Sequence, residues 1–310
     1  MKKPELIVSC GSLEETKRLI DAGADAVLVG EEKYGLRLPG NIGLSDMQVA
    51  VEWAHARGAK VYAAVNNIFD NDTLDGLTAY IEQLHLIGVD ALVFGDPAVL
   101  MIVRSLGKTI KLHWNAEMTS TNYATANYWG SQGASRVVLA RELNMEQVLE
   151  CKQHTDLEVE VQVHGITNIY HSKRELVKNY MKHQGRDHAV IEDRSKERGL
   201  FLIEHERRDQ RYPVYEDING THIMSSEDIC MLENLPELID GGVDSLKIDG
   251  LLKPLAYNEE VVKKYRMVID RYTESPDTFE FQDEWLDEIR RLQNPDRELS
   301  YGFFYKEQVY

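Results

Sequence analysis

A helix-like segment meets a short apolar run at Ile87-Gly88-Val89-Asp90-Ala91-Leu92-Val93-Phe94. Glycine at this point allows the left-handed backbone with which many helices end, and the apolar run is typical of a strand buried on both faces. The same order of features recurs around Gly23, Gly58, Gly133 and Gly242. Strand, helix and tight turn repeated in this way predict βαβ units. Their right-handed connections favour either a (β/α)8 barrel or an open doubly wound sheet.

Eight segments of this apolar kind occur along the chain, which is the number of strands in a (β/α)8 barrel. They lie at residues 5–10, 26–30, 60–65, 91–95, 110–114, 136–140, 159–163 and 245–248. Helical patterns fill the intervals, at residues 12–22, 45–57, 72–87, 97–106, 122–132, 145–154 and 228–239. Ser12, Ser45 and Asn144 each stand three residues before Glu or Gln, the spacing of a capping box. The sequence therefore predicts an α/β protein with a TIM-type barrel.

The regular alternation breaks once, between Gly165 and Thr221, where the sequence becomes polar and dense in charge. This insertion follows the seventh predicted strand, at the end of a barrel where loops carry function. We expect one barrel domain at residues 1–272, which includes the insertion at 165–221 and closes with a helix at 258–272. Residues 273–310 are predicted to form a tail packed on the barrel, with a helix at 281–292 and an aromatic segment after it.

The chain of 310 residues has a net charge of −17, which argues against binding of nucleic acid or acidic membranes by its whole surface. One stretch is locally basic and also contains three histidines; its cations are Lys173, Arg174, Lys178, Lys182 and Arg186. This stretch is either a solvated helix face or a contact for phosphate groups. No apolar run approaches the ~20 residues of a membrane span, and the N-terminus has no signal-peptide pattern. With only three cysteines, we expect a cytoplasmic protein without membrane contact.

Polar residues follow the predicted strands, at the end of the barrel where active sites lie. They are Asn66, Asn67, Asp96, Asn115, Glu117, Arg141, Glu142, His164, Lys247 and Asp249. Amides, carboxylates and cations together suit an anionic, oxygen-rich small molecule. Asn and Asp at such positions can also simply cap the next helix. The sequence contains no Gly-x-Ser-x-Gly or His-Glu-x-x-His motif and no phosphate-binding glycine loop.

Several motifs together resemble those of one known family. They are Tyr34-Gly35-Leu36-Arg37, Val65-Asn66, Arg136-Val137-Val138-Leu139-Ala140-Arg141-Glu142-Leu143, Glu160-Val161-Gln162-Val163-His164-Gly165, Ser225-Ser226-Glu227-Asp228-Ile229-Cys230 and Gly242-Val243-Asp244-Ser245-Leu246-Lys247-Ile248-Asp249-Gly250. In this order, and over nearly the whole chain, they resemble the collagenase-like peptidase U32 family. The family name implies a protease, but bacterial members are implicated in the hydroxylation of RNA and quinones. The resemblance is closest to tRNA hydroxylation proteins, which install 5-hydroxyuridine at the wobble position in a prephenate-dependent way.

The resemblance also implies where an iron–sulfur cluster would be bound. Single-chain members resemble proteins with four cysteine ligands, but Asn168 and Glu175 stand at the positions of the first two, and only Cys230 remains. A [4Fe–4S] cluster needs thiolates. We therefore expect no metal or cluster on this chain. We expect the cluster on a U32 paralogue that acts as its partner, with tRNA bound by the complex.

Site residues are assigned from these two lines of reasoning. The catalytic candidates are His164, Glu117 and Asp249. The candidates for binding a prephenate-like carboxylate are Arg37, Asn66, Asn115, Arg141, Glu142 and Lys247. The basic stretch named above is the candidate contact for RNA or a partner.

Two other functions stay open. A metal-dependent peptidase could gather its ion with His164, His183, Asp187 and His188, since His-x-x-x-Asp-His places ligands on neighbouring helical turns. A non-catalytic scaffold would only stabilise its paralogue.

Overall fold

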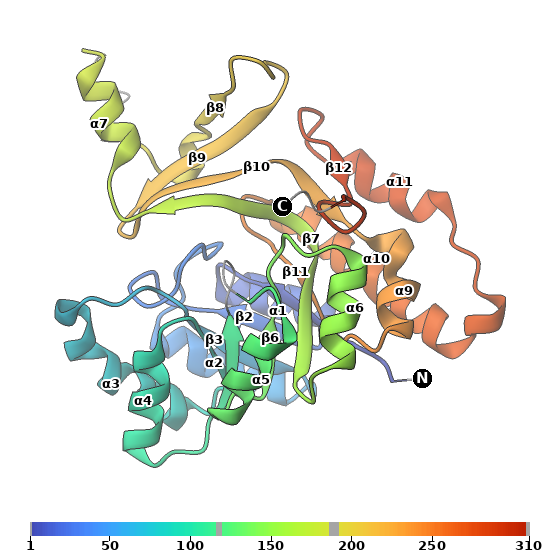
Figure 1. Ribbon diagram of the computed structural model, residues 1–310, viewed down its shortest axis with the longest axis horizontal. Coiled ribbons are helices and arrows are strands. Elements are labelled where there is room, and N and C mark those ends of the chain that lie inside the picture. The colour runs from blue at the N-terminus through green and yellow to red at the C-terminus, as the bar shows by residue number, and fades with distance from the viewer. Residues whose placement is uncertain (1, 116–119, 186–191, 308–310) are drawn as a thin grey trace.

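The computed structural model describes residues 2–115, 120–185 and 192–307. Its centre is a closed barrel of parallel strands (Figure 1). Each strand pairs with the next along the chain, and the last strand pairs with both the seventh and the first, which closes the barrel. The strands are β1 (Glu5–Ser9), β2 (Ala26–Val29), β3 (Lys60–Val65), β4 (Ala91–Phe94), β5 (Lys111–Asn115), β6 (Arg136–Val138), β7 (Glu158–Ser172) and β11 (Ser245–Ile248). The predicted TIM-type barrel is confirmed.

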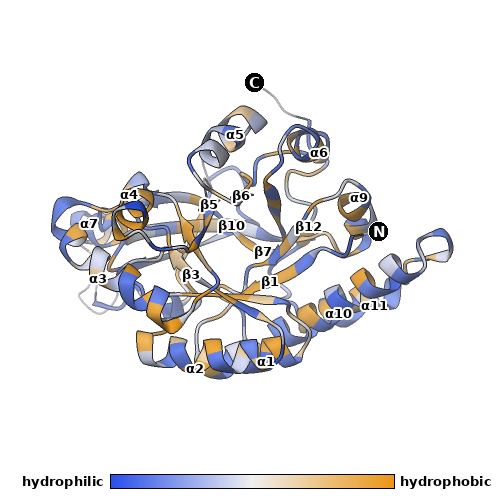
Figure 2. Cartoon of the chain, turned by 90° about the horizontal axis from the view of Figure 1, so that it is seen from below, coloured by the Kyte–Doolittle hydropathy of each residue, from blue (hydrophilic) through white to orange (hydrophobic). Residues whose placement is uncertain are grey.

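Helices surround this barrel, as Figure 2 shows from below. They are α1 (Leu13–Asp21), α2 (Leu44–His55), α3 (Asn71–Ile87), α4 (Pro97–Leu106), α5 (Tyr123–Ser131), α6 (Met145–Gln153), α9 (Leu235–Asp240) and α10 (Leu255–Glu274). Gly88 has a φ of 86° and caps α3, so the turn read from the sequence is confirmed. Ser12 and Asn144 cap their helices as predicted. The capping box at Ser45 is wrong, because α2 begins one residue earlier, after Gly43.

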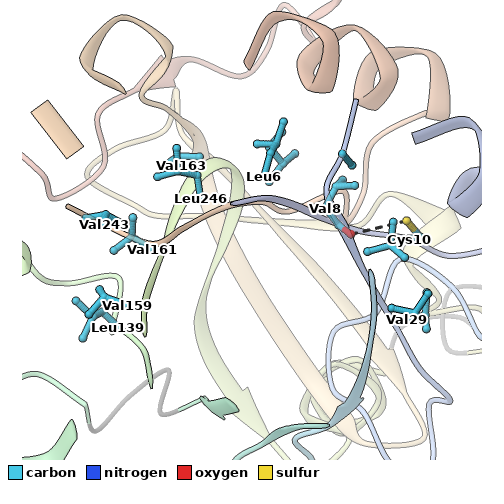
Figure 3. Close-up of a cluster of buried hydrophobic side chains, with 14 of the residues drawn as sticks. Leu6, Val8, Cys10, Val29, Leu139, Val159, Val161, Val163, Val243 and Leu246 are labelled. Atoms are coloured by element: carbon cyan, nitrogen blue, oxygen red, sulfur yellow. Dashed lines mark hydrogen bonds between the residues drawn. The ribbon is translucent and has the colours of Figure 1, made fainter. Parts of the chain in front are cut away.

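Alternate residues of each strand enter two different cores. Outward-facing side chains such as Val159, Val161 and Val163 pack against the helices in the large cluster of Figure 3. Among the side chains that face into the barrel, Ile7, Leu28, Tyr62 and Val93 belong to a small apolar core, of which Tyr62 is the largest member. On β6, by contrast, Arg136 fills the interior, with an exposed fraction of 2%.

The insertion is a β-sheet that extends over one end of the barrel (Figure 1). Strand β7 continues well past its predicted end at Val163 and pairs with β10 (Gly220–Cys230) in antiparallel fashion. Next to β10 lie β9 (Arg211–Asp217) and then β8 (Phe201–Ile203). The short helix α7 (Leu176–His183) and a 3-10 turn, η1 (Lys196–Arg198), belong to the same unit. We call the described part of residues 165–230 the arm, and the barrel end beneath it the mouth.

The predicted start of the helix at residues 228–239 is wrong. Its first residues form the end of strand β10, because Asp228 and Ile229 pair with both β7 and β12 (Leu299–Ser300). A 3-10 turn, η2 (Leu232–Asn234), then leads into α9. Apolar residues at helical spacing here belong to two elements joined by a sharp change of direction.

The C-terminal segment covers the same side of the barrel as α10. After η3 (Pro276–Thr278), helix α11 (Asp283–Leu292) buries Trp285 and Ile289 in the main core, and Phe304 from the aromatic segment joins them. Of the helices in the described residues, none combines the length and apolar character needed to span a membrane.

Candidate functional site

Two arginines lie in the mouth beneath the arm. Arg37 is in the loop after β2, where it has a left-handed backbone with a φ of 55°, and Arg141 follows β6. Burial and the charge of Arg141 lower the pKa of Arg37 to about 10, against the attraction of Tyr215 and Asp249. Burial also lowers the pKa of Arg141, although Glu142 and Asp249 favour its charged form. Two half-buried guanidinium groups that repel each other favour an anionic ligand.

Lys247 and Asp249 follow each other on the inner face at the end of β11. Their Nζ and Oδ2 atoms are 3.7 Å apart. Asp249 also accepts hydrogen bonds from Ser9 Oγ at 3.2 Å and from Leu251 N at 3.1 Å. The carboxylate therefore ties the β1 and β11 ends together, and the structure brings Lys247, Asp249 and the two arginines into one region.

The other residues predicted to lie at the mouth differ in their burial and in their contacts. Asn66 Oδ1 accepts from Leu36 N at 2.9 Å and so holds the loop that carries Arg37. Asn115 ends β5 and is 6% exposed, whereas Glu142 is exposed on the rim. Glu117 lies outside the described residues. The binding and catalytic roles assigned to these side chains stay predictions.

His164 does not point into the mouth, so its predicted placement is wrong. The pairing register between β7 and β11 shifts after Gln162, which turns His164 outward together with Ile248. Its ring nitrogens lie 3.2 Å from Tyr265 Oη and 2.9 Å from Tyr257 Oη, both on α10. Burial lowers the pKa of His164 to about 3. Both ring nitrogens are engaged by tyrosine hydroxyls of α10, so His164 offers no free nitrogen to a metal ion of a peptidase.

The next residue, Gly165, explains the second half of this His-Gly motif. Its φ is +100°, and a Cβ atom here would lie 2.3 Å from the carbonyl oxygen of Asp249. Only glycine permits this close approach, which lets β7 leave the barrel and enter the arm.

Replacing His164 by glutamine is expected to flatten the pH dependence of stability. Because the folded pKa is depressed below ~6.5, the unfolded chain binds one more proton between about pH 6 and 4. The wild-type protein should therefore lose about 2 kcal/mol between pH 7 and 5 through this group alone. Urea unfolding at both pH values measures the effect. Equal losses in wild type and His164→Gln would contradict the assignment.

The basic candidates lie at the end of the arm, around α7 at the upper left of Figure 1. Lys173 is 3.5 Å from Asp70 across an exposed gap, and Lys178 pairs with Glu175 at 2.7 Å. Arg174 and Lys182 are exposed, and Arg186 lies outside the described residues. Residues 165–221 carry 11 Lys and Arg against 10 Asp and Glu, whereas the rest of the chain carries 24 against 42. The arm is therefore the part of the chain that repels a polyanion least.

The positions that align with cluster ligands do not fit a cluster. In the β7–β10 pairing Cys230 lies opposite His164, whereas Asn168 lies opposite Met224. Glu175 is exposed at the far end of the arm, and burial raises the pKa of Cys230 to about 11. Among the described residues no three His, Cys, Asp or Glu side chains gather as a metal site. Of the proposed peptidase ligands, Asp187 and His188 lie outside the described residues.

Sequence reasoning missed the role of Asp228 in the Ser-Ser-Glu-Asp motif. Its carboxylate is fully buried and is bound by Lys253, Gln293 and Arg297. Arg297 also donates to the carbonyl oxygens of Ser225 and Glu227. An Asp within an apolar strand indicates a buried carboxylate that needs polar partners, but the local sequence does not show which residues these partners are.

Three cavities lie between the arm and the barrel. The largest, of about 520 Å³, is lined by Ile166 and Tyr215 from the arm and by Gly250 from the barrel end. One of about 320 Å³ is lined by Arg141 and Asn168, and one of about 100 Å³ by Arg37 and Tyr215. The two smaller cavities therefore adjoin the two mouth arginines.

Comparison with known proteins agrees with this architecture. Residues 11–309 match the model of peptidase family U32. The chain is 52% identical to tRNA hydroxylation protein P2 of Bacillus subtilis over the full length of both. It is 32% identical to tRNA hydroxylation protein P1 of the same organism, over the whole chain and 74% of that relative. The solved structure of the U32 peptidase Mk0906 shares the fold, with a TM-score of 0.50 at 17% identity over 79% of this chain and 92% of that one. The chain belongs to peptidase family U32.

Proposed function

We propose that this chain is a component of prephenate-dependent synthesis of 5-hydroxyuridine at the wobble position of tRNA. The proposal rests on one observation. The chain is 52% identical, over the full length of both proteins, to a protein named tRNA hydroxylation protein P2. Bacillus subtilis also has the relative named P1, and this supports action as one of two paralogues. In this proposal the partner paralogue carries the iron–sulfur cluster, because the aligned positions here do not fit one.

The mouth would hold the carboxylate ligand in this system. Arg37 and Arg141 supply two half-buried cations, and Lys247 lies nearby as a third. An adjoining cavity of about 320 Å³ falls in the range of ~300–1,000 Å³ typical of small-molecule sites. Buried guanidinium groups bind carboxylates through paired hydrogen bonds and lose affinity when solvent screens them. Prephenate, a small organic acid with two carboxylates, matches this charge.

The arm would meet tRNA or the partner chain. Its balanced charge contrasts with the acidic barrel, and Arg174 and Lys182 are exposed near its end. A basic partner chain would supply most of the tRNA contact, and the exposed cations of the arm would be the contribution of this chain. The amount of hydroxylated wobble uridine in total tRNA, measured by mass spectrometry of nucleosides from a deletion strain, tests the proposal. Full hydroxylation in a strain that lacks this chain and any redundant pathway would refute it.

Complementation of that strain with Arg141→Lys is expected to restore hydroxylation poorly. Lysine keeps the charge but loses the planar fork, and loss of a charge-assisted hydrogen bond costs roughly 10- to 100-fold in binding. Arg290→Lys, an exposed position on α11, is the matched control and should complement fully. Equal complementation by both variants would exclude Arg141 from ligand binding.

A further inference from the structure

Three buried polar side chains of the arm carry atoms that find no hydrogen-bond partner within the described residues. They are the amide oxygen and nitrogen of Asn168 on β7, Oη of Tyr215 on β9 and Nδ1 of His222 on β10. The exposed fractions of these residues are 7%, 3% and 0%. More than 90% of buried polar groups in native proteins are paired, and an exception indicates a missing water, ion or ligand.

All three side chains belong to the face of the arm that covers the mouth. The backbone oxygen of Asn168 accepts a hydrogen bond from Arg141 Nη2 at 3.1 Å. Tyr215 packs in one apolar cluster with Leu251, which follows the last barrel strand. The ring of His222 stacks on Tyr215 with 4.7 Å between ring centroids. The unpartnered atoms therefore lie opposite the half-buried arginines of the barrel.

The ring orientation of His222 is fixed from both sides. On the other face of His222 the ring of His171 stacks at 4.7 Å, and His222 Nε2 lies 3.0 Å from Asp217 Oδ1. A carboxylate accepts, so Nε2 carries a proton and is engaged by Asp217, and Nδ1 is the ring nitrogen left for another partner. Tyr215 offers a hydroxyl that both donates and accepts, and the Asn168 amide does the same.

We propose that Asn168, Tyr215 and His222 form the roof of the ligand site, above a floor made by Arg37 and Arg141. This inference rests on the proposed function and adds the residues that choose the ligand. The Asn168 amide and the Tyr215 hydroxyl are neutral, so they suit hydroxyl or carbonyl oxygens rather than further carboxylates. The ligand class is therefore an organic acid that carries a hydroxyl or keto group besides its carboxylates.

The roof gives selectivity because a ligand that fails to pair with it leaves the buried groups without partners. A plain monocarboxylate can satisfy an arginine but not the roof, and each buried group left unpaired weakens binding by roughly tenfold. Arg141 and Asn168 line one cavity, and Arg37 and Tyr215 line another, so each cavity is bounded by one floor residue and one roof residue.

Tyr215→Phe and Asn168→Leu test the roof with little change of shape. In the ligand-free protein these variants should melt at the same temperature as wild type or higher, since the atoms removed have no partner in the described structure. Isothermal titration with prephenate should show binding weakened about 5- to 100-fold in each variant. Acetate should bind wild type and variants with equal, weak affinity. Tyr80→Phe is the matched control, because Tyr80 Oη on α3 also lacks a partner among the described residues.

Unchanged prephenate affinity in both roof variants, or no binding of prephenate by the wild-type chain, would overturn this inference. Either result would leave the proposed function intact, because that is decided by wobble hydroxylation in the deletion strain. Conversely, full hydroxylation in the deletion strain would refute the proposed function, and the titrations would still decide the roof.

Discussion

Replacement of Asp228 by alanine is expected to lower the free energy of unfolding by about 3–5 kcal/mol, because removing one partner of a buried ion pair leaves the other without compensation. The carboxylate is 0% exposed. Arg297 Nη2 lies 2.7 Å from Oδ1, Gln293 Nε2 lies 2.6 Å from Oδ2, and Lys253 also binds Oδ2. Burial alone would raise the pKa of Asp228, but Arg297 and Lys253 hold it well below its usual range. Urea unfolding at pH 7 measures the loss.

Asp296→Ala provides the control, since Asp296 pairs with Arg211 at 2.5 Å on an exposed surface. Such pairs contribute about 0–1 kcal/mol, so this variant should unfold like wild type. The sign of the pH effect follows from the depressed pKa of Asp228. Its stabilisation is present above the unfolded value of about 4 and is lost as the pH falls below it. Equal stability of the two variants would show that the cluster contributes nothing.

The position of Asp228 gives this cluster a consequence for the site. Asp228 is on the arm strand β10, Lys253 follows the last barrel strand, and Arg297 belongs to the C-terminal segment. One carboxylate thus joins the base of the arm to the barrel and the tail. Loss of the cluster should loosen the arm above the mouth, and ligand binding should weaken along with stability.

The barrel could be predicted from sequence because its signals are local. Each βαβ unit shows its own apolar run and its own helix-ending glycine, as around Gly88, and pairing partners are neighbours in the chain. The arm lacked such signals. Its central strands, β7 and β10, pair residues that are far apart in the chain, such as Ser172 and Thr221. On β7 the exposed Ile169 follows the buried polar residue Asn168, which faces the mouth. A sequence of this kind predicts an irregular insertion instead of a sheet.

Only some of the site residues could be predicted from the sequence, for the same reason. The rule that strand ends point into the mouth found Arg141 after β6. Arg37, in the loop after β2, was added by the family resemblance. The rule failed for His164, because a register shift against β11 decides which way that side chain points. It could not find Tyr215 or His222, since they reach the mouth only through pairing of β9 with β10. Long-range pairing of this kind has no local sequence signature.

Arg136→Met is the second substitution with a large expected effect, again about 3–5 kcal/mol. Arg136 is 2% exposed inside the barrel, at the end opposite the mouth. Its Nη1 lies 2.6 Å from Glu5 Oε1 and 3.0 Å from Glu160 Oε2. Methionine fills part of the space but leaves Glu160 buried without its cation and leaves Glu5 with Lys60 alone. Arg104→Met, on the exposed face of α4, is the control and should change stability by less than about 1 kcal/mol.

The pH dependence distinguishes a lost charge from a simple packing defect. Burial favours the neutral acid, but Arg136, with Lys60 and Tyr62, lowers the pKa of Glu5 to about 2 in the wild-type protein. The wild-type stabilisation is therefore lost only as the pH falls from about 4.3 towards 2. Without Arg136, only Lys60 and Tyr62 oppose the effect of burial, so the pKa of Glu5 rises towards its unfolded value and the variant loses less stability in acid. The difference between wild type and Arg136→Met should therefore shrink as the pH falls from about 4.3 towards 2, whereas a cavity would cost the same at both pH values.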